Sequence, residues 1–326
     1  MLKLRLYYLI ILCLSLFSCI GNDDDTVTLV LLPDTQIYSE RYPDIFHAQT
    51  AWIAKKADSI DFVLHQGDIT NHNTSEEWEV AAAAMHRLDG VVPYAFTIGN
   101  HDMGTNGSAD KRNTDLFNQW FPYQEYNNRP EFGGAMESGK MDNTWWTFNA
   151  GGTDWLVVSL EFGPRDNVLD WAGGIIKAHP EHKVIINTHA YMYADDTRMG
   201  AKPEHKWLPK SYGLANNDTV NDGETIWEKL ASQYPNVFLV FSGHVLGDGT
   251  GTLTSKGNHG NLVYQFLANY QSGVDDSAYG GSGFLRIVKI NLSKAEISVK
   301  TFSPYLDSYN TAQDQDFTIQ LQHPSD

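Results

Sequence analysis

The sequence predicts an α/β protein in which parallel strands alternate with helices and a second, mixed sheet follows. Short apolar, β-branched runs alternate with segments of helical spacing between residues 26 and 98. Strand–helix–strand order implies parallel strands joined by right-handed crossovers. Later strand-like runs follow one another without long helices between them, which favours a mixed second sheet. No internal repeat and no linker divides the chain.

The first part of the pattern contains three strands and two helices. Thr26 to Leu32 is a short apolar run rich in β-branched residues and ended by Pro33, as expected of a buried strand. Helices are predicted over 44–60 and 75–88, the second with acidic residues early and Arg87 late. The other two strands are predicted over 61–66 and 91–98.

Beyond residue 104 the pattern loosens. Residues 104–142 are rich in Asn, Gly and Pro and predict a long loop with one short helix over 113–120, and residues 191–220 predict a second long insertion. We expect the domain to span 27–303 and residues 304–326 to be a C-terminal tail. Further strands are predicted over 145–148, 154–160, 183–187, 237–241, 262–268, 284–291 and 296–302.

The first 25 residues are predicted to lie outside the fold. A basic start at Lys3 and Arg5 precedes an apolar run that ends at Phe17 and is too short to cross a bilayer as a helix, which predicts a signal peptide over 1–18. Leu16-Phe17-Ser18-Cys19 resembles the lipobox of bacterial lipoproteins, which implies lipidation of Cys19. Residues 19–26 read as an acidic tether. We therefore expect an exported protein held by lipid to a bacterial membrane, at its periplasmic face or at the cell surface.

The charge balance of the chain limits the kinds of molecule that it can bind. Lys and Arg number 23 against 40 Asp and Glu, a net charge of -17, so we expect no binding to a nucleic-acid backbone. A hydrophobic fraction of 42% is that of a folded domain. In so acidic a chain an anionic substrate needs a local positive charge, and a bound metal is the obvious source.

Polar side chains follow five predicted strands at the point where each strand ends. The carboxyl ends of strands in an α/β sheet open into one crevice, so these side chains should meet there. Carboxylate, amide and imidazole groups are the usual ligands of first-row divalent metals. A glycine precedes three of them and allows a sharp turn or a close backbone approach. The series is Asp34-Thr35-Gln36, Gly67-Asp68, Gly99-Asn100-His101-Asp102, Asn187-Thr188-His189 and Ser242-Gly243-His244.

This ordered series resembles that of the calcineurin-like metallophosphoesterases, the superfamily that includes purple acid phosphatases. The family motifs are D-x-H, G-D, G-N-H-[DE], a lone His and G-H-x-H, and the resemblance covers most of residues 27–303. It implies two mixed β-sheets packed face to face and flanked by helices, a four-layer α/β/β/α sandwich, with two divalent metals (Mn, Zn, Fe or Mg) at the carboxyl ends of the strands.

The resemblance also implies a role for each residue. The first metal site would be formed by Asp34, Gln36 and Asp68. Asp68 would bridge to the second metal site, which Asn100, His189 and His244 would complete. His101 would contact the substrate and stabilise or protonate the leaving oxygen, with Asp102 close behind it.

Two positions depart from the family pattern, and both belong to the first metal site. Gln36 replaces the His of D-x-H, as in some branches of the family, and Leu246 replaces the last His of G-H-x-H. Asp248 either supplies the missing ligand or serves only the turn Gly247-Asp248-Gly249. An all-oxygen first site would favour Mg²⁺, Mn²⁺ or Ca²⁺, whereas two imidazoles suit Zn²⁺, Mn²⁺ or Fe²⁺. We expect a tight second site and a weak or empty first one.

The predicted function is hydrolysis of small phosphate monoesters or diesters by attack of a metal-bound hydroxide on phosphorus. A degenerate, metal-containing binding lipoprotein without turnover is the alternative, favoured by Leu246. A protein Ser/Thr phosphatase would carry G-D-x-x-D-R-G, whereas Gly67-Asp68 continues as Ile69-Thr70-Asn71. The many aromatic residues could stack on sugars, but Trp145, Trp146, Trp155 and Trp171 sit in apolar segments typical of a core.

Overall fold

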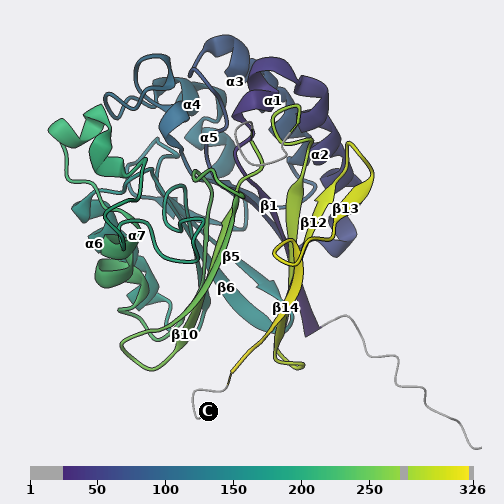
Figure 1. Cartoon of the computed structure of the whole chain (residues 1–326), viewed down its shortest axis with the longest axis vertical. Helices are drawn as coiled ribbons and strands as arrows, with labels where there is room; N and C mark the ends of the chain where they lie inside the picture. The colour runs from purple at the N-terminus through teal and green to yellow at the C-terminus, as the bar shows by residue number, and fades with distance from the viewer. Residues whose placement is uncertain (1–24, 272–277, 323–326) are drawn as a thin grey trace, which may run out of the picture.

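Two seven-stranded sheets pack face to face between two groups of helices (Figure 1). The structure, a computed structural model, describes residues 25–271 and 278–322. Cross-sheet contacts join the layers: the ring of Phe62 in one sheet stacks on Phe148 in the other at 5.0 Å between centroids. The side-chain amide of Asn187 donates to the carbonyl of His65 across the same interface, at 3.0 Å. The predicted sandwich with flanking helices is confirmed.

The first sheet has the strand order β13-β12-β11-β1-β2-β3, with β14 also paired to β12. The predicted parallel core is present, because β1 pairs in parallel with β2 and β2 with β3. β11 and β12 pair antiparallel in this sheet, whereas the sequence pattern assigned them to the second sheet. The bounds are β1 Thr26–Leu32, β2 Phe62–His65, β3 Tyr94–Phe96, β11 Leu285–Asn291, β12 Glu296–Ser303, β13 Ser308–Asn310 and β14 Asp316–Gln320.

The second sheet has the order β4-β5-β6-β7-β8-β10-β9. Its centre is parallel, from β6 through β7 and β8 to β10, and its edges are antiparallel. The bounds are β4 Phe132–Ala135, β5 Thr144–Ala150, β6 Thr153–Leu160, β7 Lys183–Thr188, β8 Val237–Ser242, β9 Thr250–Lys256 and β10 Leu262–Ala268.

The helices cover the outer faces of the two sheets. α1 and α2 lie on the right flank in Figure 1, and α6 and α7 on the left. Local sequence fixes their starts: Pro43 occupies the first turn of α2, and the Thr74 hydroxyl caps α3 by accepting the Glu77 amide at 3.4 Å. The bounds are α1 Gln36–Arg41, α2 Pro43–Lys55, α3 Ser75–Met85, α4 Asp115–Trp120, α5 Tyr123–Tyr126, α6 Asp166–Ala178 and α7 Gly223–Ile226.

Two expectations about the later part of the chain differ from the structure. We expected no long helix between the later strands, yet α6 runs for 13 residues between β6 and β7. Its two central glycines lower helix propensity, and at Gly173 the Tyr234 hydroxyl packs into the space that a Cβ would occupy. The segment predicted as a tail, 304–326, contributes β13 and β14 to the first sheet, so the sheet extends to Gln320. The predicted signal and tether, with Cys19, lie outside the described residues apart from Asp25 and Thr26.

No helix among residues 25–271 and 278–322 is long and apolar enough to cross a membrane.

Candidate metal centre

Three of the predicted site residues lie at sharp left-handed turns directly after strands. Asp34 follows β1 with φ 44°, Asp68 follows β2 with φ 48°, and His244 follows β8 with φ 76°. Non-glycine residues adopt this conformation at a cost, and such strain is concentrated at functional sites. The turns direct all three buried side chains to one place between the two sheets.

The glycines beside these residues have two different roles. Gly67 has φ 87° and makes the turn before Asp68 possible. Gly99 and Gly243 are needed for close approach instead, because a Cβ there would collide with the carboxylates of Asp68 and Asp34 respectively. Any larger residue at either position would displace a predicted metal ligand.

The second metal site centres on Nε2 of the buried His189. This atom lies 3.2 Å from the Asn100 side-chain oxygen, 3.3 Å from Oδ1 of Asp68 and 3.2 Å from Nδ1 of His244. Ligand atoms of Asp68, His189 and His244 all lie within 4.8 Å of one another. The structure therefore brings together the four side chains predicted for this site.

Backbone carbonyls orient both imidazoles toward the centre. Nδ1 of His189 donates to the carbonyl of Gln66 at 2.7 Å, and Nε2 of His244 donates to the carbonyl of Trp207 at 2.8 Å. Each ring therefore turns its other nitrogen toward the site, as second-shell partners of metal-binding histidines do. Sequence could not reveal Gln66 and Trp207 as these partners, because a carbonyl contact has no side-chain signature.

Electrostatics at the centre favour a cation. Burial opposes the charge on Asp68, but the neighbouring imidazoles, His189 foremost, hold the pKa of this carboxyl below its usual range. Burial likewise opposes protonation of His189, but Asp68 and Asp34 outweigh it and raise its pKa to about 9. Burial and the charge on His189 lower the pKa of His244 to about 3, so that ring stays neutral.

A divalent cation fits this arrangement better than the proton does. One N–H on His189 faces three acceptor atoms, on Asp68, Asn100 and His244, and cannot satisfy all of them. A metal ion in the same place could accept one lone pair from each of the four side chains. The donor set of two imidazoles, one carboxylate and one amide oxygen is that of first-row divalent metals.

The first metal site is less complete. Burial raises the pKa of Asp34 well above its usual range, and its carboxylate accepts only the His244 amide, at 3.0 and 3.2 Å, among the described residues. Gln36 turns its amide nitrogen to Oδ2 of Asp68 at 3.1 Å, while its buried oxygen has no hydrogen-bond partner in the described chain. Asp248 is exposed and accepts the Thr250 amide at 3.1 Å, which matches the turn role.

His101 and Asp102 have separate positions. The His101 amide donates to Oδ1 of Asp68 at 2.9 Å, and its ring Nδ1 contacts the Asn71 carbonyl at 2.8 Å, so Nε2 is left for a substrate. The buried Asp102 instead ties two strand ends together by accepting the Thr70 and Gly99 amides, each at 2.8 Å. Asp102 thus fixes the turn that carries Asn100 and His101.

Two aromatic residues from outside the predicted set, Phe162 and Tyr212, pack on one side of the imidazoles. Phe162 packs against His189 and His244 at 5.8 and 5.3 Å between ring centroids, and Tyr212 packs on Phe162 at 5.1 Å. Tyr212 and Trp207 both belong to the insertion predicted over 191–220. The Leu214 amide donates to the carbonyl of Ala109 at 2.9 Å, which fixes this insertion to the other long loop.

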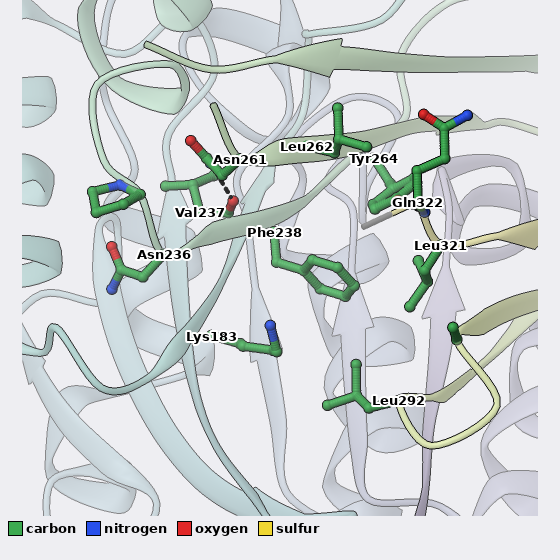
Figure 2. A pocket seen from close by; sticks show the side chains of 12 residues that line it. Lys183, Asn236, Val237, Phe238, Asn261, Leu262, Tyr264, Leu292, Leu321 and Gln322 are labelled. Atoms are coloured by element: carbon green, nitrogen blue, oxygen red, sulfur yellow. Dashed lines mark hydrogen bonds between the residues drawn. The ribbon is translucent and has the colours of Figure 1, made fainter. Parts of the chain in front are cut away.

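A separate cavity of about 310 Å³ lies at the other end of the second sheet, where β7, β8 and β10 begin (Figure 2). Its walls include Phe238, Leu292 and Leu321, and the Lys183 ammonium lies 4.7 Å from the Phe238 ring centroid. None of the predicted site residues lines it. We place the chemistry at the strand carboxyl ends, where the ligand atoms converge, and not in this cavity.

Comparison with known proteins agrees with this geometry. The family description "Calcineurin-like phosphoesterase" matches residues 22–248, more than half of the chain. The protein therefore belongs to the calcineurin-like phosphoesterase family, a class of hydrolases that act on phosphoester bonds.

Individual proteins that resemble this chain share little sequence identity with it. The uncharacterized protein YvnB of Bacillus subtilis (strain 168) is 28% identical over 294 residues, which is 88% of this chain but only 20% of that protein. Purple acid phosphatase PPD1 from yellow lupin seeds has a similar fold, with a TM-score of 0.54 and 10% identity, over 91% of this chain and 54% of that one. The NAD nucleotidase of Haemophilus influenzae gives a TM-score of 0.46 at 13% identity, over 89% of this chain and 50% of that one.

Proposed function

We propose that this protein is a metal-dependent hydrolase of small phosphate monoesters or diesters. The observation that carries the proposal is the convergence on one point of four side chains, those of Asp68, Asn100, His189 and His244. Backbone carbonyls orient both imidazoles toward this point. Family membership supports the same reaction class.

Asp68, Asn100, His189 and His244 would hold one divalent ion, and Asp34, Gln36 and Asp68 offer oxygen atoms for another. When bound, such an ion supplies positive charge for the phosphate oxygens and lowers the pKa of water. The strained turns keep these side chains in place before substrate arrives, which favours electrostatic stabilisation of the transition state.

His101 would act on the leaving group. Its amide donates to Asp68 and its ring Nδ1 lies 2.8 Å from the Asn71 carbonyl, and these contacts favour one orientation of the ring. Nε2 makes no hydrogen bond within the described residues and is the atom that would give a proton to the departing alkoxide. Asp102 acts through the backbone by holding the turn, and we assign it a positioning role.

The direct test is hydrolysis of p-nitrophenyl phosphate and bis-p-nitrophenyl phosphate by metal-stripped protein with Mn²⁺, Zn²⁺, Fe²⁺ or Mg²⁺ added back. We expect no turnover without metal and turnover of at least one ester with Mn²⁺ or Zn²⁺. Absence of turnover with every metal, in protein shown to bind metal, would favour the alternative function.

That alternative is a metal-containing binding lipoprotein without turnover. Two observations favour it: Leu246 offers no ligand to the first metal site, and Gln36 occupies Oδ2 of Asp68 with its amide nitrogen. Tight binding of inorganic phosphate to the metal-loaded protein, together with failure to hydrolyse either ester, would establish it.

We also propose export and lipid anchoring through Cys19, on the strength of the sequence pattern over residues 1–25. In a bacterial host, metabolic labelling with an alkyne fatty acid should mark the wild type, and Cys19→Ala should remove the label. A wild type without label would contradict the anchor and leave an ordinary cleaved signal.

A further inference from the structure

His65 is the last residue of β2 and is fully buried, yet none of the roles described above uses its side chain. The ring packs against Phe46 of α2 and Phe96 of β3, with centroids 6.1 and 6.2 Å away. Burial, and then the charge of His189, lower the pKa of His65 to about 3, so the ring stays neutral. Buried polar groups are stable when they have hydrogen-bond partners, so the partners of this ring indicate what it does.

Both ring nitrogens of His65 bond to the turns that carry the two carboxylates of the first metal site. Nδ1 lies 3.2 Å from the amide nitrogen of Gly67, the residue before Asp68. Nε2 lies 2.9 Å from the hydroxyl of Thr35, the residue after Asp34. An amide N–H can only donate, so Nδ1 carries the lone pair and the ring proton is on Nε2, which donates to Thr35. One neutral imidazole therefore links the two turns.

The same link reaches the residue on the other side of Asp68. The Thr35 hydroxyl accepts the His65 proton and gives its own proton to the Ile69 carbonyl in a longer contact of 3.5 Å. The Ser39 hydroxyl donates to this carbonyl as well, at 2.6 Å. Hydrogen bonds thus hold the backbone immediately before and immediately after Asp68.

Both turns need support from their surroundings. Asp34 and Asp68 adopt left-handed backbone conformations, with φ of 44° and 48°, which cost energy and persist only where neighbouring groups hold them. β1 and β2 are adjacent parallel strands in which Leu32 pairs with His65, so the two turns leave the sheet side by side. A side chain that bonds to both turns can therefore fix one carboxylate relative to the other.

We propose that His65 and Thr35 are positioning residues that form a buried clamp, which sets the separation of Asp34 and Asp68 and thereby the affinity of the first metal site. This inference rests on the metal binding in the proposed function, but it does not depend on turnover. The second metal site depends on the clamp less, because it takes only Asp68 from these two turns. The clamp thus adds to the first site a support that its own ligands do not provide.

The test is a calorimetric titration of metal-free protein with Mn²⁺, which gives the affinity of each site without any substrate. Thr35→Val removes the hydroxyl but keeps the shape, and should weaken the first site about tenfold while the second stays within about twofold. His65→Asn keeps an acceptor for the Gly67 amide but cannot reach Thr35, so it should cause a similar loss. His65→Leu loses both contacts and should cost about 100-fold. Thr50→Val, whose buried hydroxyl bonds to carbonyls of α2, is the matched control and should change neither site.

The double variant Thr35→Val/His65→Asn separates a clamp from two unrelated structural roles. Both single changes break the same link, so the second change should add less than about threefold to the first-site loss, whereas independent effects would multiply. A general loss of stability would lower the melting temperature without changing the ratio of the two metal affinities. If His65→Leu does not fold, the two milder variants still decide the question.

Three results would overturn the clamp: an unchanged ratio of the two affinities in Thr35→Val, full multiplication of the losses in the double variant, or a wild type that binds no second equivalent at millimolar Mn²⁺. The clamp and the proposed function fail in different ways. Protein that binds both metals and responds to these variants, but hydrolyses neither ester, contradicts the proposed function and supports the clamp. Normal turnover with an unchanged affinity ratio in Thr35→Val contradicts the clamp alone.

Discussion

The two halves of the metal centre share Asp68 and the same end of the sandwich, yet they differ in donors and in support. In the second metal site both imidazoles are oriented by carbonyls, from Gln66 and Trp207, and aim at one point. In the first metal site Asp34 is held by a backbone amide and Gln36 turns its nitrogen inward. A metal site has high affinity when neighbouring groups orient its ligands and leave their lone pairs free to bind the metal. The comparison therefore predicts that the second site binds its metal tightly and the first site binds weakly.

The largest effect should come from His244→Ala. Removing one of two imidazoles should weaken metal binding by at least about 100-fold, because even second-shell changes cost 10–100-fold. Nearly all activity should be lost with the metal. Elemental analysis after gel filtration measures the metal, and His259→Ala, which lies on the exposed β9–β10 turn, is the matched control. Full metal content in His244→Ala would remove this residue from the site.

His101→Ala should separate chemistry from metal binding. The ring contacts the Asn71 carbonyl and not the second metal site, so metal content should stay within about 20% of wild type, while turnover should slow by about 10²–10⁴. Steady-state kinetics and elemental analysis on the same preparation check both halves of the statement. A preparation that has lost its metal would instead place His101 among the ligands.

The sequence predicted both the sandwich and the set of polar residues at its strand ends. It did so because each ligand follows a short, buried, β-branched strand, and because the turns after β2 and β8 are marked by glycines that the structure requires. The two elements that sequence analysis did not predict, α6 and β14, have no strong local pattern of residues. The two central glycines of α6 lower the helix signal of its sequence, and the alternation of Phe317 and Ile319 in β14 is short and half exposed.

The supporting shell of the site was also beyond sequence reasoning. The carbonyls of Gln66, Asn71 and Trp207 hold three histidines, and any residue type can provide a carbonyl. Trp207 was indistinguishable from eight core tryptophans until its exposure and its contact with His244 were known. The insertion over 191–220 therefore hid part of the support of the second metal site.

The pH dependence of metal binding should sharpen the comparison further. Below pH 9 His189 carries a proton in the metal-free protein, which metal must displace, so affinity should rise with pH and level off near 9. For one proton the loss is about tenfold per pH unit, or about 100-fold from pH 8 to pH 6. Calorimetry with Zn²⁺ or Mn²⁺ across this range measures the slope. His189→Asn has no such proton and should give a much flatter slope, and a wild type equally flat would contradict the assignment.

The smallest effects concern the first metal site. Leu246→His restores the imidazole of the family pattern and should lower the Mn²⁺ concentration for half-maximal rate by several-fold, at some cost in stability because a half-buried apolar side chain is lost. Asp248→Ala should change metal binding less than twofold, because the carboxylate serves the turn. Metal titrations of activity, with thermal melts as a control for folding, test both. A large loss of metal affinity in Asp248→Ala would make this residue the missing ligand.

The claim that the two metal sites differ in affinity is tested most directly by the metal stoichiometry of the wild-type protein. Metal-free protein is titrated with Mn²⁺ in a calorimeter at pH 8, and the dialysed product is checked by elemental analysis. The account predicts one equivalent bound tightly, retained through dialysis and lost in His244→Ala, with a second equivalent at least about 100-fold weaker. Two equivalents of similar affinity would contradict the central claim, as would one equivalent that survives His244→Ala.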